Sequence, residues 1–187
     1  MHLYALCDQD TLTSKGLSLE DFVLTCKEKN AEIIQYRNKN ASTAEIKKTL
    51  ILLRSLWDKF LIVNDHYALA SFCDGVHLGQ EDLYAIDTNP QSAIKILKEV
   101  VGSEKLIGLS THNKEEIAIA NTLDLNYIGL GAYRSTKTKD VSTILGDTLD
   151  VLAKESKHYV AAIGGVQFND TFLHVRYHVM GSALYES

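Results

Sequence analysis

Short apolar runs recur along this chain, and segments with helical spacing of apolar residues separate them. We interpret the runs as buried strands, because each one is too short for a helix and ends at polar residues or glycine. Strands that alternate with helices at this spacing are typical of parallel βαβ units. The expected strands cover residues 3–6, 31–36, 60–63, 75–78, 106–109, 126–130, 159–163 and 177–180.

Capping signals mark where several helices should begin. Ser18, Ser42 and Asn113 are each followed three residues later by an acidic side chain, which is the pattern of a capping box. Pro90, the only proline, suits the first turn of a helix. We therefore expect helices after these three caps, a short helix over 66–73, one near 89–101 and one near 143–155.

Polar clusters follow nearly every expected strand from the second to the eighth. An open doubly wound sheet binds ligands at one switch point, whereas a closed barrel brings all strand ends to one rim. The pattern therefore favours an α/β fold of the (β/α)8 TIM-barrel type, in one domain over residues 1–187. The chain is short for a barrel and only five residues follow Ser182, so we expect the eighth helix to be truncated or absent.

Composition narrows the classes of partner. The formal net charge is -5 and no long basic block occurs, which argues against nucleic acid. Three cysteines lie far apart without a Cys-x-x-Cys pair, as expected in a reducing cytoplasm. No charged leader precedes an apolar stretch, and no apolar run has the roughly 20 residues that a membrane helix needs. We expect a cytoplasmic protein that binds small molecules.

Two aspartates are the candidate metal ligands. Asp65 and Asp82 follow separate strands, and carboxylate oxygens on short loops suit a hard cation such as Mg²⁺. The alternative for Asp65 is a structural one, in which it caps the short helix that begins near His66.

Cations and glycines at other strand ends point to phosphate. Arg37 and Lys39 are two residues apart in an extended segment, so both can face the same side and bind a phosphate. The alternative is that they are solvated surface cations. Lys139 lies in a loop rich in Ser and Thr. Gly164-Gly165 and Gly181-Ser182 follow the last two strands, where many barrels bind a phosphate, although each glycine alone could be a turn.

Other motifs are incomplete. Gly129-Leu130-Gly131 lacks the third glycine of a dinucleotide fingerprint, because position 134 is Arg. His174 and His178 have the spacing of zinc ligands on a helix, but their segment reads partly as strand and no acid completes the motif. We therefore discount a dinucleotide site and a zinc site.

Taken together, the clusters resemble the thiamine-phosphate synthase family and its TenI-type relatives, over about residues 3–184. Six motifs occur in the family's order, which is far more specific than any one of them. They are residues 35–39 (QYRNK), 64–65 (ND), 75–82 (GVHLGQED), 108–112 (GLSTH), 131–139 (GAYRSTKTK) and 162–165 (AIGG).

The resemblance implies a transferase of thiamine biosynthesis. It would condense 4-amino-2-methyl-5-pyrimidinylmethyl diphosphate with hydroxyethylthiazole phosphate to give thiamine phosphate and pyrophosphate. By position, Asp65 and Asp82 would hold Mg²⁺ on the diphosphate, and Gln35 would contact the pyrimidine with His77 nearby. The pyrophosphate oxygens would be held by Arg37, Lys39, Asn64, Ser110 and Lys139, and the thiazole phosphate by Thr136, Gly165 and Ser182.

Departures from the family pattern leave alternatives open. Ala132 replaces a usual Pro, Arg134 replaces an apolar residue, and the stretch 166–179 is short, which affects the thiazole-phosphate half. One alternative is a TenI-type thiazole tautomerase that uses His112. Another is a barrel that binds thiamine intermediates without catalysis. Apolar barrel surface left by the lost helix could be covered in a homo-oligomer.

Overall fold

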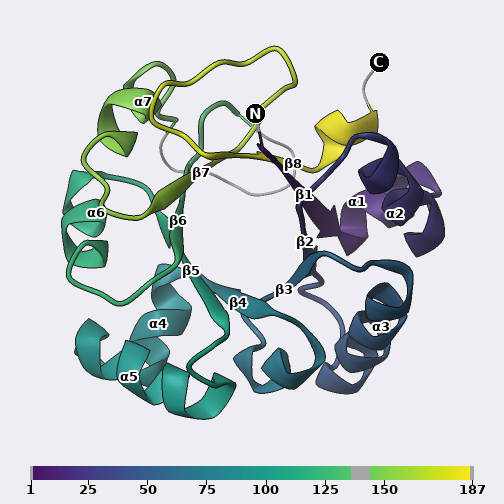
Figure 1. Cartoon of the computed structure of the whole chain (residues 1–187), viewed down its shortest axis with the longest axis horizontal. Coiled ribbons are helices and arrows are strands. Elements are labelled where there is room, and N and C mark those ends of the chain that lie inside the picture. The colour runs from purple at the N-terminus through teal and green to yellow at the C-terminus, as the bar shows by residue number, and fades with distance from the viewer. Residues whose placement is uncertain (1, 136–143, 186–187) are drawn as a thin grey trace.

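Eight parallel strands close into a barrel in sequence order, in a computed structural model that describes residues 2–135 and 144–185 (Figure 1). Each strand pairs with the next along the chain, and β8 pairs with β1. The expected (β/α)8 barrel is confirmed. The strands are β1 (His2–Asp8), β2 (Ile33–Arg37), β3 (Phe60–Asn64), β4 (Gly75–Leu78), β5 (Leu106–Thr111), β6 (Tyr127–Gly131), β7 (Tyr159–Ile163) and β8 (Tyr177–Met180).

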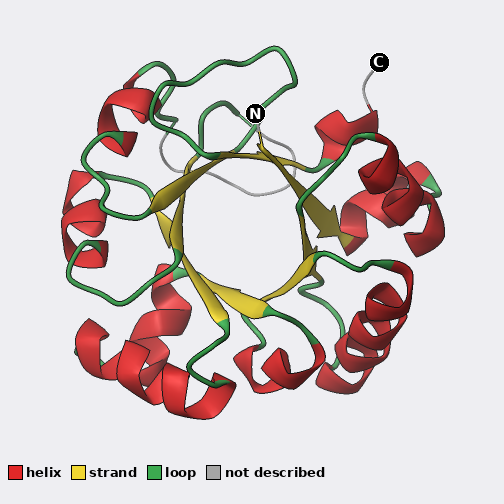
Figure 2. Cartoon of the chain, in the orientation of Figure 1, coloured by secondary structure: helices red, strands yellow, loops and turns green. Residues whose placement is uncertain are grey.

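Helices surround most of this ring, as Figure 2 shows in red around the yellow strands. The capping boxes at Ser18 and Ser42 are present, and Asn89 caps the helix that has Pro90 at its start. The helical elements are α1 (Gln9–Lys15), α2 (Leu19–Glu28), α3 (Thr43–Leu56), η1 (Tyr67–Phe72), α4 (Gln80–Ile86), α5 (Pro90–Val101), α6 (Lys114–Ala120), α7 (Thr148–Ala153) and η2 (Ser182–Tyr185).

Alternation along the strands divides the buried residues into two cores. In β2, Ile34 packs in the outer core between strands and helices, whereas Ile33 packs inside the barrel. The inner core also contains Tyr4, Ile62 and Val179. Apolar residues fill much of the barrel interior, and polar side chains take their place toward the carboxyl ends of the strands.

Helix α1 was not expected from the sequence. Its only buried side chain is Leu12, so residues 9–15 show no apolar periodicity. The helix forms because the Asp8 side chain accepts a hydrogen bond from the Thr11 N–H at its start, and Gly16 ends it in the left-handed conformation. It places a helix at the rim of the barrel directly after β1.

The outer layer is incomplete beside β7 and β8. Residues 164–176, all of them described, form neither helix nor strand, and η2 is one short 3-10 turn in place of an eighth helix (Figure 2). Loss of the helix after β8 was expected, whereas the absence of a helix between β7 and β8 was not. The Phe172 ring covers this side, with its centroid 5.1 Å from that of His178 and 5.0 Å from that of Tyr133.

Three cysteines lie buried in the outer core as free thiols: Cys7, Cys26 and Cys73. Burial raises the pKa of Cys26 to about 12, so this thiol serves packing rather than nucleophilic chemistry. Within residues 2–135 and 144–185, no helix is long and apolar enough to cross a membrane.

The aromatic cover of β7 and β8 gives a stability prediction. Phe172→Ala should lower the free energy of unfolding by about 2 kcal/mol, because the ring is partly buried and its removal opens a cavity over the strands. Leu173→Ala is the matched control, since Leu173 is 89% exposed and should change stability by less than about 0.5 kcal/mol. Denaturant unfolding measures both, and equal effects would show that Phe172 does not cover the barrel.

Candidate active site

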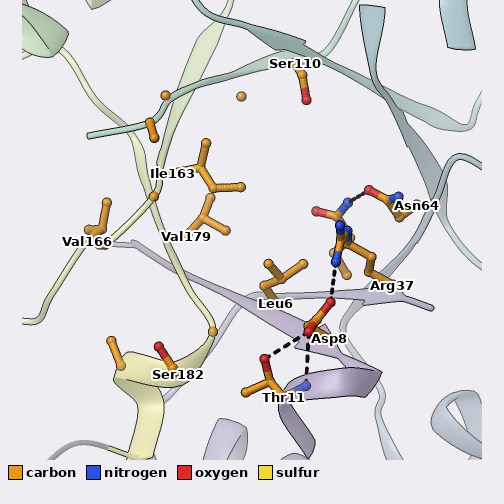
Figure 3. A pocket seen from close by; sticks show the side chains of 18 of the residues that line it. Leu6, Asp8, Thr11, Arg37, Asn64, Ser110, Ile163, Val166, Val179 and Ser182 are labelled. Atoms are coloured by element: carbon orange, nitrogen blue, oxygen red, sulfur yellow. Dashed lines mark hydrogen bonds and ion pairs between the residues drawn. The ribbon is translucent and has the colours of Figure 1, made fainter. Parts of the chain in front are cut away.

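A cavity of about 770 Å³ opens at the carboxyl ends of the strands (Figure 3). Side chains from the ends of β1, β2, β3 and β5 face it, together with the glycine loops after β7 and β8. This is the rim where barrels place their ligand sites. Eight of the predicted site residues line it: Gln35, Arg37, Asn64, His77, Ser110, His112, Gly165 and Ser182.

Arg37 is held in place by a residue that the sequence did not single out. Its Nη1 lies 2.5 Å from Oδ1 of Asp8, which is 4% exposed (Figure 3). Asp8 also accepts hydrogen bonds from the main-chain N–H and the hydroxyl of Thr11. Asp8 therefore fixes the guanidinium at the cavity wall. Its position after the first strand, like that of the other polar clusters, was a signal that could have revealed it.

Asp65 and Asp82 lie next to each other, and Asn64, which lines the cavity, connects Asp65 to its wall. Asp65 follows β3 directly with a positive φ of 62°, and its N–H donates to the His77 carbonyl at 2.8 Å. Asp82 lies in the first turn of α4 and accepts from the Gly79 N–H at 3.1 Å. Asn64 Nδ2 donates to Asp65 at 2.6 Å.

Burial and the neighbouring Asp82 carboxylate change the acidity of Asp65. Burial raises the pKa of Asp65 to about 6, and the adjacent negative charge of Asp82 adds to this, while Arg37 and Lys39 oppose it. Such a pair is stabilised by a shared proton or by a cation. The alternative that Asp65 caps a helix is wrong, because His66 occupies the cap position of η1 and that turn has no side-chain cap.

The other predicted cations, Lys39 and Lys139, and Thr136 are not among the described residues that line the cavity. Lys39 is exposed beyond the end of β2, and it acts on the site through its charge on Asp65. Thr136 and Lys139 lie outside the described residues. Among the described residues, no group of three or more His, Cys, Asp or Glu side chains surrounds a single point, so a metal at Asp65 and Asp82 would need oxygens from a substrate or water.

The glycine loop after β7 forms the opposite wall. Gly164 has a φ of 91°, and a Cβ there would lie 2.5 Å from the Cβ of Ala132, so only glycine fits. Gly165 and Ser182 line the cavity from this side. That this wall binds a phosphate stays a prediction from the sequence.

Arg134 ties this loop to the rest of the rim. Its guanidinium makes two hydrogen bonds to the Asp170 carboxylate, at 2.7 and 2.6 Å, and a third to the Gly165 carbonyl at 2.9 Å. The two hydrogen bonds from Arg134 to the carboxylate lower the pKa of Asp170. The departure at Arg134 thus acquires a structural role, since the ion pair holds a connection that contains no helix.

The fold and the site define a class: a (β/α)8-barrel enzyme with paired carboxylates, cations and a glycine loop on one rim. The chain matches the thiamine monophosphate synthase family over residues 3–187 and belongs to it. It is similar to the thiamine-phosphate synthases of Persephonella marina (34% identity over 89% of this chain and 77% of that one) and Lawsonia intracellularis (37% identity over 88% and 74%). It is also similar in structure to a thiamine phosphate pyrophosphorylase from Pyrococcus furiosus, with a TM-score of 0.71 and 28% identity over 89% and 76% of the two chains.

The Arg134–Asp170 pair can be tested without a substrate. Asp170→Asn should speed hydrogen exchange at the main-chain N–H groups of Arg134 and Gln167 and lower the free energy of unfolding by about 1 kcal/mol, because a two-point charged contact is lost. Asp124→Asn is the control, since Asp124 pairs with Lys98 on the exposed surface. Unchanged exchange in Asp170→Asn would mean that the pair does not hold the loop.

Proposed function

We propose that this chain catalyses the condensation of 4-amino-2-methyl-5-pyrimidinylmethyl diphosphate with hydroxyethylthiazole phosphate. The products are thiamine phosphate and pyrophosphate. The observation that carries the proposal is the apposition of Asp65 and Asp82 beside Arg37 and Lys39, in a chain of this family. Acids and cations at one rim suit a diphosphate that arrives with a divalent ion.

Mg²⁺ fits the acidic pair. Asp65 and Asp82 offer hard oxygen donors, and their mutual repulsion is relieved when a cation neutralises both. When bound, the ion neutralises charge that develops on the departing pyrophosphate. Asp65 and Asp82 would hold it, and the scarcity of other acidic or histidine ligands among the described residues leaves positions for phosphate oxygens.

Arg37, Lys39, Asn64 and Ser110 would bind the pyrophosphate oxygens, with Lys139 as a further cation. Arg37 is already oriented by Asp8, so little side-chain entropy remains to be lost when an oxygen binds. Gln35, 3% exposed at the cavity floor, would contact the pyrimidine ring, with His77 beside it. These residues favour the state in which the diphosphate carries most negative charge.

The reaction breaks the C–O bond between the pyrimidinylmethyl carbon and the diphosphate, and the bonding electrons leave with pyrophosphate. The carbon becomes a cation stabilised by the electron-rich ring, and the lone pair of the thiazole nitrogen forms the new C–N bond. The nitrogen carries no proton, so the step needs no general base. Catalysis then depends on electrostatic stabilisation and on holding the two rings in line.

The second substrate would bind at the glycine wall. Gly165 and Ser182 line the cavity there, and Thr136 is proposed with them from the sequence. The Arg134–Asp170 pair would keep Gly165 in position for the thiazole phosphate. This arrangement supports a retained thiazole-phosphate site despite the short connection between β7 and β8.

Incubation of the protein with both phosphorylated substrates and Mg²⁺ tests the proposal. We expect thiamine phosphate and pyrophosphate in equal amounts, and no product when either substrate or the ion is left out. Absence of product with all components present would contradict the proposal.

Removal of one acidic ligand should abolish the reaction. Asp65→Ala should lower kcat/KM by about a thousandfold or more, equivalent to about 4 kcal/mol, because the ion on the leaving group loses a ligand. Asp58→Ala is the control, since Asp58 is exposed on the surface and should leave turnover unchanged. Full activity of the Asp65 variant would remove this carboxylate from the mechanism.

Affinity for Mg²⁺ should depend on pH in a defined direction. The pKa of Asp65 is raised to about 6, so its protonated form accumulates as the pH falls through that value. A protonated carboxyl is a poor ligand, and the dissociation constant should rise about tenfold for each pH unit below this point. Calorimetric titration of Mg²⁺ across this range measures it, and a flat profile would disprove a role for Asp65.

One observation favours a second candidate function. His112 lines the cavity, and its Nδ1 lies 2.9 Å from Glu116 Oε2, an arrangement that orients the ring for proton transfer. A TenI-type tautomerase would convert the thiazole carboxylate phosphate without metal, and His112→Ala would stop it. Metal-free conversion by the wild-type chain, without thiamine phosphate formation, would favour this candidate over the synthase.

A further inference from the structure

Hydrogen-bonded side chains, some of which line the cavity, cross the barrel interior and join β1 through β6 in one connected path. The path runs from Asp65, at the acidic pair, to Ser110 on the far wall. We propose that Tyr4 and Tyr127, within this path, are positioning residues that set the orientation of the Gln35 amide and the protonated nitrogen of His77. The kinetic part of this inference rests on the proposed function, whereas the structural part does not.

The first half of the path has a defined direction. Asn64 Nδ2 donates to the Asp65 carboxylate at 2.6 Å, so Asn64 Oδ1 faces inward and accepts from Gln35 Nε2 at 2.7 Å. The amide oxygen of Gln35 then accepts from the Tyr4 hydroxyl at 2.9 Å. A carboxylate can only accept, so the Asn64 amide must turn its nitrogen toward Asp65, and this fixes which end of Gln35 faces Asn64. Gln35 consequently presents its nitrogen toward β3 and its oxygen toward β1.

Counting the hydroxyl protons shows which nitrogen of His77 is protonated. The single hydroxyl proton of Tyr4 is used on Gln35, so the contact of 2.8 Å between the two tyrosine oxygens requires Tyr127 to donate. The oxygen of Tyr127 can then only accept at its contact of 3.1 Å with His77 Nδ1. Nδ1 therefore carries a proton. In the neutral ring, Nε2 accepts from the Ser110 hydroxyl at 3.0 Å.

The proton count holds because both phenols stay protonated. Tyr4 is 1% exposed and Tyr127 is 4% exposed. Burial raises the pKa of each phenol well above its ordinary value of 10.0. Each hydroxyl therefore has one proton to donate throughout the working pH range.

Packing around the path restricts the rings to this arrangement. The His77 ring stacks on that of Tyr127, with centroids 5.5 Å apart and planes at 29°. A Cβ at Gly108 would lie 2.2 Å from Tyr127 Cζ, and one at Gly129 would lie 3.0 Å from His77 Cε1. These two glycines leave the space that the stacked pair occupies, so the geometry of the path is a property of the fold.

The path has a consequence for recognition. Gln35 lines the cavity, and a reversed amide would exchange its donor for its acceptor toward any ring bound there. Asn64 opposes the reversal, because a turned amide would place the Gln35 oxygen against the Asn64 oxygen, and neither can donate. The Tyr4 hydroxyl stabilises the same orientation by donating to the Gln35 oxygen. Tyr4 thus acts on the substrate through Gln35, without contacting it.

Nitrogen-15 NMR of the full chain labelled at histidine tests the structural part without any substrate. We expect His77, assigned by its loss in His77→Gln, to carry its proton on Nδ1 and to have an unprotonated Nε2. Tyr127→Phe removes the acceptor and should shift the proton toward Nε2. Tyr36→Phe is the matched control, since the Tyr36 hydroxyl bonds to Gln9 and Asn38 outside the path, and it should leave the His77 signals unchanged.

Kinetics with both substrates test the consequence for Gln35. Tyr4→Phe should raise KM for the pyrimidine diphosphate about tenfold, corresponding to about 1.4 kcal/mol, and leave KM for the thiazole phosphate unchanged. A His77 proton on Nε2, or on both nitrogens, in the wild-type chain overturns the proposal, as does a Tyr127→Phe spectrum identical to wild type. Equal changes in both KM values would show a general structural effect. If the NMR result is as expected and no thiamine phosphate forms, the proposed function fails and the positioning path stands.

Discussion

Two carboxylates held side by side are the constraint on which this site depends. Asp65 directly follows β3 and Asp82 lies in the first turn after β4, and the parallel pairing of these two strands brings the two positions together. Like charges at such a site are unfavourable unless positive charge compensates them. Arg37 and Lys39 supply part of that charge from β2 and its following loop. The negative charge that these two side chains leave uncompensated is the physical reason to expect a cation at this rim, and an anionic ligand bound with it.

The same rim is held by polar contacts that extend well beyond the carboxylates. Asp8 restrains Arg37, Asn64 links Asp65 to Gln35, and the two buried tyrosines continue the path across the barrel floor. A buried polar group is costly without a partner, so this interior is stable because its members satisfy one another. Beside β7 and β8, where no helix covers the strands, the Phe172 ring packs against His178 and the Arg134–Asp170 pair fixes the connecting loop. Among the described residues, the barrel therefore lacks part of its outer layer while the polar contacts at its rim are retained.

Much of this fold was predictable because its signals are local. Apolar runs bounded by polar residues identified all eight strands, and capping residues such as Ser42 identified helix starts. Helix α1 was missed because all of its residues except Leu12 are polar, and its stability comes from a cap and from Gly16. The stretch 166–179 is short in the sequence, but only the structure shows that it contains no helix.

Site residues followed the same division. The ends of strands are visible in sequence, so Asp65, Arg37 and Gln35 could be proposed as site residues from position and from resemblance to a family, and the structure places Gln35 and Arg37 in the cavity wall. Asp170 was not found, because its partner lies 36 residues away and only the folded chain brings the two together. The direction of the path through Tyr4 and Tyr127 also needed the structure, because it depends on contacts between strands that are distant in sequence.

The central claim is that Asp65 and Asp82 share one divalent ion with a pyrophosphate group. A crystal of the protein grown with Mn²⁺ and pyrophosphate measures this most directly, because the ion's anomalous scattering locates it independently of the surrounding atoms. The account predicts one peak bonded to an oxygen of each carboxylate and to at least one phosphate oxygen. A peak elsewhere, or bound pyrophosphate with both carboxylates turned away from it, would contradict the account.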